Sequence, residues 1–126
     1  MPKSVIYSSQ APEPIGPYSQ AVEAGNMVFI SGQIALDRST GNLLTGSIEV
    51  ETQKVMENLK EILTAAKLDF SKVVKCSIFL KDMNNFPKVN AVYGEYFKQD
   101  PPARETVEVS RLPKDVNVEI SCIAVR

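Results

Sequence analysis

The chain of 126 residues contains no histidine and no tryptophan, and it has only two cysteines. Without histidine it lacks the side chain that most often moves protons near neutral pH and the commonest ligand of zinc. Cys76 and Cys122 each stand inside an apolar run, and there is no Cys-x-x-Cys pair. We therefore expect two buried, reduced thiols rather than a disulfide or a metal site. A Ser-His-Asp triad is excluded, and no glycine-rich phosphate loop or nucleotide fingerprint is present.

The chain also lacks an excess of either charge and any long hydrophobic run. Its 14 basic and 15 acidic residues give a net charge of −1, which provides no general attraction to nucleic acid or to an acidic membrane. No apolar run approaches the length of a membrane span, and the N-terminal residues show no targeting pattern. We expect a cytoplasmic protein with neither a nucleic acid nor a membrane as partner.

The clearest pattern in the chain is the periodicity of two amphipathic helices. In residues 48–66 an apolar residue recurs every three or four positions, and Ser47 is the expected N-cap. Residues 85–99 predict a second helix, which Pro101-Pro102 is expected to end. The predicted stripes are Val55, Leu59, Ile62, Leu63 and Ala66 in the first helix, and Phe86, Val89, Tyr93, Tyr96 and Phe97 in the second.

Six other segments are short, apolar and bounded by glycine or proline, which is typical of strands. With the helices they give the order β-β-β-α-β-α-β-β. This order predicts a single α+β domain over residues 1–126, in which two helices pack on one face of a mixed six-stranded sheet. Gly25-Asn26 is expected to form the turn of a hairpin. The predicted strands are residues 5–7, 19–24, 27–31, 73–80, 104–110 and 117–125.

Strand alternation predicts that Arg104 and Glu119 lie on the same face of the sheet. In the last strand the neighbours Val118 and Ile120 should meet the helices, which turns Glu119 away from them. In the strand before it, assigning Val107 to the helices turns Arg104 away as well. Apolar side chains share this second face, which two helices cannot also cover. We therefore expect this face to be buried against another subunit.

Arg104 and Glu119 are the most useful chemical groups in a chain without histidine. Arg104 is always charged and is able to hold a carboxylate through two parallel hydrogen bonds, although a structural ion pair or a solvated rim position is the commoner role. Glu119, between apolar neighbours, must be paired, solvated in a cleft or shifted in pKa. The alternative is an acid on a wet sheet face like Glu108, and the residues alone leave both open.

Three other positions are weaker candidates. Tyr18 ends a proline-rich loop and is suited to form the wall of a pocket, although packing is the commoner role of such a tyrosine. Ser31 and Gly32 end a strand where a backbone can approach a ligand closely; the alternative is a simple bulge or turn. Asn90 lies off the apolar stripe of the second helix, which predicts a surface position.

Five motifs taken together closely resemble the reactive intermediate deaminase A (RidA) family, in order and over essentially the whole chain. The resemblance implies a chorismate-mutase-like fold and a homotrimer with ligand clefts between subunits. It implies no cofactor and the activity of a 2-iminobutanoate/2-iminopropanoate deaminase, which hydrolyses 2-imino and 2-enamino acids to 2-keto acids and ammonia. The motifs are Gly16-Pro17-Tyr18-Ser19-Gln20-Ala21, Phe29-Ile30-Ser31-Gly32-Gln33-Ile34, Val89-Asn90-Ala91-Val92-Tyr93, Pro102-Ala103-Arg104 and Arg111-Leu112-Pro113-Lys114-Asp115-Val116.

The resemblance also implies roles for individual residues. Arg104 matches the arginine that binds the substrate carboxylate, and Glu119 matches the acid that positions or activates water. The chain departs from the family at Thr106, where many bacterial members have cysteine, and at Ser121, where a second acid is common. Thr106 is retained as a pocket position, and Ser121 leaves Glu119 as the only acid of its strand. The other matched pocket positions are Tyr18, Ser31, Gly32 and Asn90.

Two other functions compete with the deaminase. A non-catalytic sensor or protein partner that binds small carboxylate metabolites would need Arg104 but has little use for Glu119. An RNA-cleaving inhibitor of translation, a role attached to relatives, is disfavoured by the near-neutral charge and by the lack of a basic and aromatic cluster.

Overall fold

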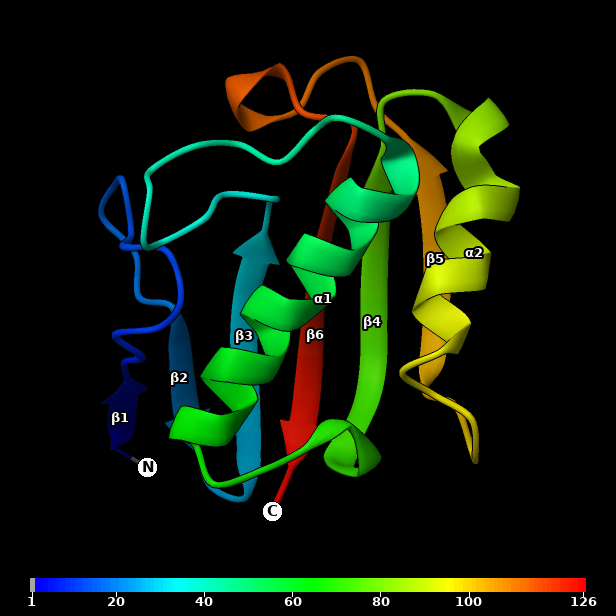
Figure 1. Cartoon of the computed structure of the whole chain (residues 1–126). Helices are drawn as coiled ribbons and strands as arrows, with labels where there is room; N and C mark the ends of the chain where they lie inside the picture. Colours follow the sequence, from blue (N-terminus) through cyan, green and yellow to red (C-terminus); the bar gives the residue numbers. More distant parts are fainter. Residues whose placement is uncertain (1) are drawn as a thin grey trace.

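The structure, a computed structural model, describes residues 2–126 and consists of one sheet layer and one helix layer (Figure 1). The strands lie in the order β1-β2-β3-β6-β4-β5. β4 and β5 are parallel, and the other neighbouring pairs are antiparallel, so the predicted mixed six-stranded α+β fold is confirmed. The strands are β1 (Lys3–Ile6), β2 (Ala21–Ala24), β3 (Met27–Gln33), β4 (Val73–Leu80), β5 (Ala103–Glu108) and β6 (Val118–Val125).

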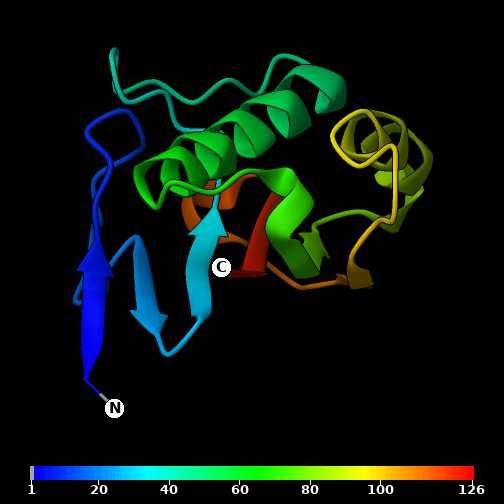
Figure 2. The same ribbon diagram turned by 90° about the horizontal axis from the view of Figure 1, so that it is seen from below.

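Helix α1 (Ile48–Ala65) runs across the middle of the sheet, as predicted. It begins where Ser47 Oγ accepts a hydrogen bond of 3.1 Å from the backbone N–H of Val50, which is the expected N-cap. All five residues of its predicted stripe are buried. Both α1 and α2 lie on the same side of the sheet (Figure 2), so the opposite side has no helix over it among the described residues.

Helix α2 (Phe86–Gly94) is shorter than predicted, because it ends at Gly94 rather than at Pro101-Pro102. Glycine is a poor helix former, and beyond it the chain tightens into turns whose N–H groups bond three residues back. Tyr96 and Phe97 nevertheless pack against Phe70, with ring centroids 5.3 and 5.2 Å away. The aromatic pattern therefore predicted the packing of these residues correctly but not the length of the helix.

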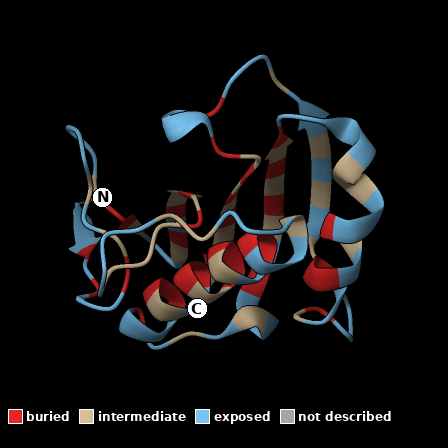
Figure 3. Ribbon diagram, turned by 45° about the horizontal axis from the view of Figure 1, so that its top comes forward, coloured by how far each residue is buried: buried red, intermediate tan, exposed pale blue. Residues whose placement is uncertain are grey.

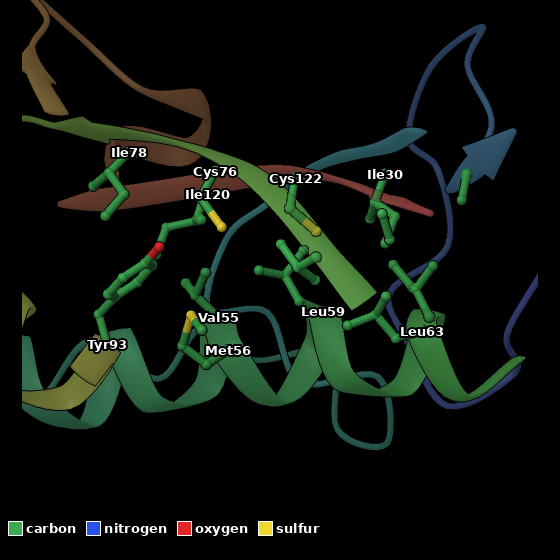
Figure 4. Close-up of a cluster of buried hydrophobic side chains, with 14 of the residues drawn as sticks. Ile30, Val55, Met56, Leu59, Leu63, Cys76, Ile78, Tyr93, Ile120 and Cys122 are labelled. Carbon is green, nitrogen blue, oxygen red and sulfur yellow. The ribbon is translucent and has the colours of Figure 1, made fainter. Parts of the chain in front are cut away.

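The core fills the space between α1 and the strands β3, β6 and β4. Burial alternates along β4 and β6, with one face of each strand buried (Figure 3). The inward side chains from the sheet meet Val55, Leu59 and Leu63 of α1 (Figure 4). Cys76 and Cys122 belong to this core as free, buried thiols, as predicted.

The face of the sheet without helices, here called the open face, is partly apolar, as predicted. The strand register aligns apolar residues across it in two separate rows, and Phe29 and Val107 are 43% and 41% exposed. An apolar patch of this kind marks a surface that normally meets a partner. One row is Val5, Val22, Phe29 and Ile123 on β1, β2, β3 and β6, and it continues to Lys75 on β4; the other row contains Phe79 and Val107 on β4 and β5.

The 3-10 turn at Pro113–Asp115 connects β5 to β6. It contains two consecutive residues, Lys114 and Asp115, with positive φ values of 54° and 56°. Non-glycine residues rarely adopt this conformation, and Asp115 is held by an ion pair of 2.9 Å with Lys81 at the end of β4. The ion pair thus ties this strained turn to the sheet. In residues 2–126, no helix has the length and apolar character that crossing a membrane requires.

Candidate functional site

Glu119 of β6 lies in a pocket of about 360 Å³ on the open face. The walls come from the loop before β2, the end of β3 and the turn before β6. Most of them are apolar, and only Ser31, Tyr18 and Glu119 bring polar side chains. The lining residues are Ile15, Tyr18, Ser31, Gly32, Ile34, Pro113 and Glu119.

A β-bulge brings the backbone of β3 close to Glu119. Ile30 pairs with Cys122 and Gln33 with Ile120, so the two residues Ser31 and Gly32 face a single residue of β6. A Cβ atom built on Gly32 would overlap the Glu119 carboxylate and lie 2.8 Å from its Cδ. The carboxylate thus occupies the space that any larger side chain at position 32 would need. The alternative of a bulge is confirmed, and because the segment also lines the pocket, the close approach to a ligand stays a prediction.

Burial raises the pKa of the Glu119 carboxyl above its ordinary value, and burial is the sole cause of the shift. Desolvation disfavours the charged form, and no ion pair within residues 2–126 offsets it. An acid of this kind holds its proton more tightly than a surface acid. A raised pKa of this kind is typical of carboxyls that transfer protons near neutral pH.

The loop in front of the pocket is held by Gln20, which the sequence did not single out. Its buried side chain accepts a hydrogen bond of 2.6 Å from the N–H of Ser8 and donates one of 2.9 Å to the carbonyl of Pro12. Ser31 Oγ donates to the Ser19 carbonyl at 2.6 Å and so joins the bulge to the same loop. The feature that identifies Gln20 as a residue holding this loop is the burial of its polar amide, and burial of a polar side chain is not visible in the sequence.

Arg104 lies on the helix face of the sheet, so the prediction that it shares a face with Glu119 is wrong. On β5 it is the register partner of the buried Cys76 on β4, and its guanidinium carbon lies 5.0 Å from the ring centroid of Tyr93 on α2. The error came from giving Val107 to the core. β5 is an edge strand, where apolar character does not decide the face, and Val107 in fact faces outward.

Asn90 is half-buried and contacts Arg104, which corrects its predicted surface position. Its Oδ1 accepts a hydrogen bond of 2.7 Å from Nη1 of Arg104. It lies off the apolar stripe because its partner is a cation on the strand below. Thr106 follows Arg104 on the same face, and its buried Oγ1 has no hydrogen-bond partner among the described residues.

The seven predicted site residues therefore form two groups on opposite faces of the sheet. Tyr18, Ser31 and Gly32 surround Glu119 on the open face, whereas Asn90 and Thr106 accompany Arg104 under α2. Glu119 pairs with Phe79 on β4, and Phe79 pairs with Val107 on β5, three residues beyond Arg104. Strand spacing then separates the two Cα atoms by about 14 Å. A small substrate does not span this distance within one chain.

A metal site finds no support in the described residues 2–126, where no three acidic or cysteine side chains gather closely enough to hold an ion.

Pro113 and Ile34 were not assigned to the pocket from sequence as individual residues, although both stand in the family motifs. Their roles as walls depend on the bulge and on the strained turn, which are features of the folded backbone.

Comparison with known proteins places this geometry in a family. The family model described as "Endoribonuclease L-PSP" matches residues 8–126. A RutC family protein of Pyrococcus horikoshii is 55% identical over 122 residues, covering 97% of each chain. A protein named 2-iminobutanoate/2-iminopropanoate deaminase from Dermatophagoides farinae is 46% identical over 124 residues, covering 98% of this chain and 97% of its own.

The fold gives the same result. The crystal structure of YyfA from Yersinia pestis, described as a protein of the conserved Rid family, has a TM-score of 0.97 and 44% sequence identity. The match covers 99% of this chain and 100% of that chain. The chain therefore belongs to the RidA family, whose model carries the endoribonuclease L-PSP description and some of whose members are named deaminases.

Proposed function

We propose that the protein hydrolyses reactive 2-imino and 2-enamino acids, such as 2-aminoacrylate, to 2-keto acids and ammonia. The observation that carries this proposal is Glu119, a carboxyl with a raised pKa and no ion pair in residues 2–126, seated in an apolar pocket. Support also comes from the deaminase name of a relative that matches almost the whole chain.

The chemistry requires only water and a group that moves protons. The oxygen of a water molecule bonds to C2 of the imine while Glu119 accepts a proton from that water. The nitrogen takes up two protons, one returned by Glu119 and one that replaces the proton lost by the C2 hydroxyl. The C2–N bond breaks, and ammonia leaves as the C2–O bond becomes the carbonyl of the 2-keto acid. An enamine first gains a proton at C3 and loses one from its nitrogen to become the imine. Such proton transfer contributes on the order of 10²–10⁴-fold to the rate.

Arg104 is the proposed binding group for the substrate carboxylate. A guanidinium offers two parallel N–H groups to a carboxylate, which fixes both the position and the orientation of the imine carbon. Tyr18, Ser31 and Gly32 are proposed to line the substrate on the Glu119 side, and Asn90 and Thr106 on the Arg104 side. No cofactor enters these steps.

The proposal requires a second copy of the chain, because Arg104 and Glu119 lie on opposite faces of one sheet. We propose a homotrimer in which the open face of each subunit meets the next and the cleft forms at that interface. The partly apolar open face supports this assembly. Sedimentation at micromolar concentration should give a trimer, and a monomer would contradict the shared cleft.

The activity is tested by generating 2-aminoacrylate in situ with a serine dehydratase and following its loss. Wild type should accelerate the loss, and Arg104→Ala and Glu119→Ala should each remove most of that acceleration. If wild type has no effect but binds 2-keto acids, the protein is a carboxylate sensor instead. Full activity of Glu119→Ala would refute the role of that residue while leaving the deaminase intact.

A further inference from the structure

The guanidinium of Arg104 is surrounded by three side chains from one face of α2. Phe86, Asn90 and Tyr93 stand at positions i, i+4 and i+7, a spacing that aligns side chains along one face of a helix. The guanidinium carbon lies 5.5 Å from the ring centroid of Phe86 and 5.0 Å from that of Tyr93. Asn90 Oδ1 accepts from Nη1 at 2.7 Å.

None of these contacts neutralises the positive charge. Within residues 2–126 no carboxylate lies within ion-pair distance of Arg104. The two acids of its own strand are engaged elsewhere: Glu105 pairs with Lys75 at 3.0 Å, and Glu108 accepts from the N–H of Met83 at 2.8 Å. Arg104 is thus a half-buried cation whose only hydrogen-bond partner among these residues is a neutral amide.

We infer that Phe86, Asn90 and Tyr93 form a positioning device that orients the Arg104 guanidinium before substrate arrives and keeps its charge free. Aromatic rings attract a guanidinium without offering an anion to it, and the amide fixes the rotation of its plane. Nη1 donates one N–H to Asn90, which leaves the other N–H donors of the guanidinium free to bind a carboxylate. The inference rests on the proposed function for the identity of that carboxylate.

The ring of Tyr93, rather than its hydroxyl, supplies this contact. The ring rises from α2 toward the sheet beside Cys76 (Figure 4), and its buried hydroxyl interacts with the Cys76 thiol. Tyr93 also packs on Phe97 in the core, with centroids 4.8 Å apart. Phe86 at the start of α2 is only half-buried, so it is the better position for a test substitution.

The inference has a direct test in the ligand-free protein. NMR relaxation of the Arg104 Nε–H reports how rigidly the guanidinium is held, with the exposed Arg111 as an internal reference. Phe86→Leu should make the Arg104 Nε–H more mobile. The control is Phe70→Leu, the same change at another half-buried aromatic that contacts Tyr96 and Phe97 instead. It should leave the mobility of Arg104 unchanged.

Carboxylate binding supplies the second readout, with 2-oxobutanoate as the probe. Phe86→Leu should raise the Kd of the probe and the KM for imine about two- to five-fold, as expected for one cation–π contact, with kcat unchanged. Asn90→Asp keeps the shape of the side chain but adds an anion beside Arg104. It should raise the Kd more than Phe86→Leu does, because the new carboxylate competes with the probe.

The outcomes separate this inference from the proposed function. If wild-type Arg104 is as mobile as Arg111, or if Phe86→Leu and Phe70→Leu change mobility and Kd equally, the positioning device is refuted. If Phe86→Leu loosens Arg104 and weakens the probe while wild type hydrolyses no imine, the device stands and the deaminase proposal fails.

Discussion

Arg104 and Glu119 lie on opposite faces of the same sheet, about 14 Å apart by strand spacing. Arg104 projects under α2 against Tyr93, and Glu119 projects into the pocket on the open face. One chain therefore carries the two proposed half-sites, one for an anion and one for proton transfer, on different faces of its sheet. Any reaction that uses both groups on a small substrate requires residues from two copies of the chain.

Replacing Gly32 with alanine should impair catalysis without unfolding the protein. The added Cβ would displace the Glu119 carboxylate, and misplacing a catalytic group by about 1 Å costs on the order of 10²-fold in rate. Steady-state kinetics should show the loss mainly in kcat. Gly46→Ala is the matched control, because a Cβ there meets no atom within 4 Å. Equal activity of the two variants would contradict the close contact.

Glu119→Gln should make the protein more stable at neutral pH. Burial raises the pKa of Glu119 in the folded state above its unfolded value near 4.5, so ionisation costs the folded state more than the unfolded state. The stability contributed by the protonated carboxyl is present below pH 4.5 and is lost as the pH rises through the folded pKa. Urea unfolding should show Glu119→Gln gaining over wild type from pH 4 to pH 7.

The same shift predicts the acid side of the pH–rate profile. If Glu119 must be ionised to accept a proton from water, kcat/KM should fall as the pH drops through a pKa above 4.5. Glu119→Gln should remove this limb along with most of the activity. An acid limb that persists unchanged in the residual activity of Glu119→Gln would assign the titration to another group.

Glu51 predicts a stability effect remote from the pocket. It is fully buried on α1, and its carboxylate accepts hydrogen bonds from the N–H groups of Asn117 and Val118 at 2.7 and 3.1 Å. Glu51→Ala would leave the buried N–H of Val118 and the half-buried N–H of Asn117 without this acceptor, which costs about 3 kcal/mol. Denaturant unfolding at fixed protein concentration measures this loss. Glu49→Ala, at an exposed position two residues earlier, should cost below about 0.5 kcal/mol.

Glu51 also illustrates a limit of sequence interpretation. Its neighbour Glu49 has the same side chain in the same first turn, where the helix dipole favours either acid equally. Which of the two is buried depends on where the start of β6 meets α1, 66 residues further along the chain. The periodicity of apolar residues along a helix indicates which face is buried, but it does not indicate which polar residue is buried by a distant segment of the chain.

The elements themselves followed from sequence wherever one face was strongly apolar. Helix α1 was predicted within one residue at its C-terminal end, and β4 matched in full. The face of Arg104 could not be predicted, because β5 is an edge strand whose outward Val107 is as apolar as a core residue. Arg104, which lies inward, is held by the aromatic rings of Phe86 and Tyr93. A hydrophobicity pattern identifies such rings only as core residues and gives no sign that they contact a cation.

Membership of the candidate site stays a prediction, and its arrangement was not predicted from sequence. The family motifs identified Glu119 with its neighbours Tyr18, Ser31 and Gly32, which the structure brings together around one pocket. They also identified Arg104, but neither motif nor spacing revealed that it belongs to a second group. That division depends on strand register and on which face a helix covers, both of which are properties of the whole fold.

Complementation between two inactive variants tests the central claim most directly. Arg104→Ala and Glu119→Ala subunits are mixed in equal amounts, unfolded, refolded together and assayed for imine hydrolysis. If the cleft is shared between copies, random assembly gives about one quarter of the clefts both intact residues, and about a quarter of wild-type activity should return. No activity above that of the separate variants would contradict the account, because it would mean that both residues act from the same chain.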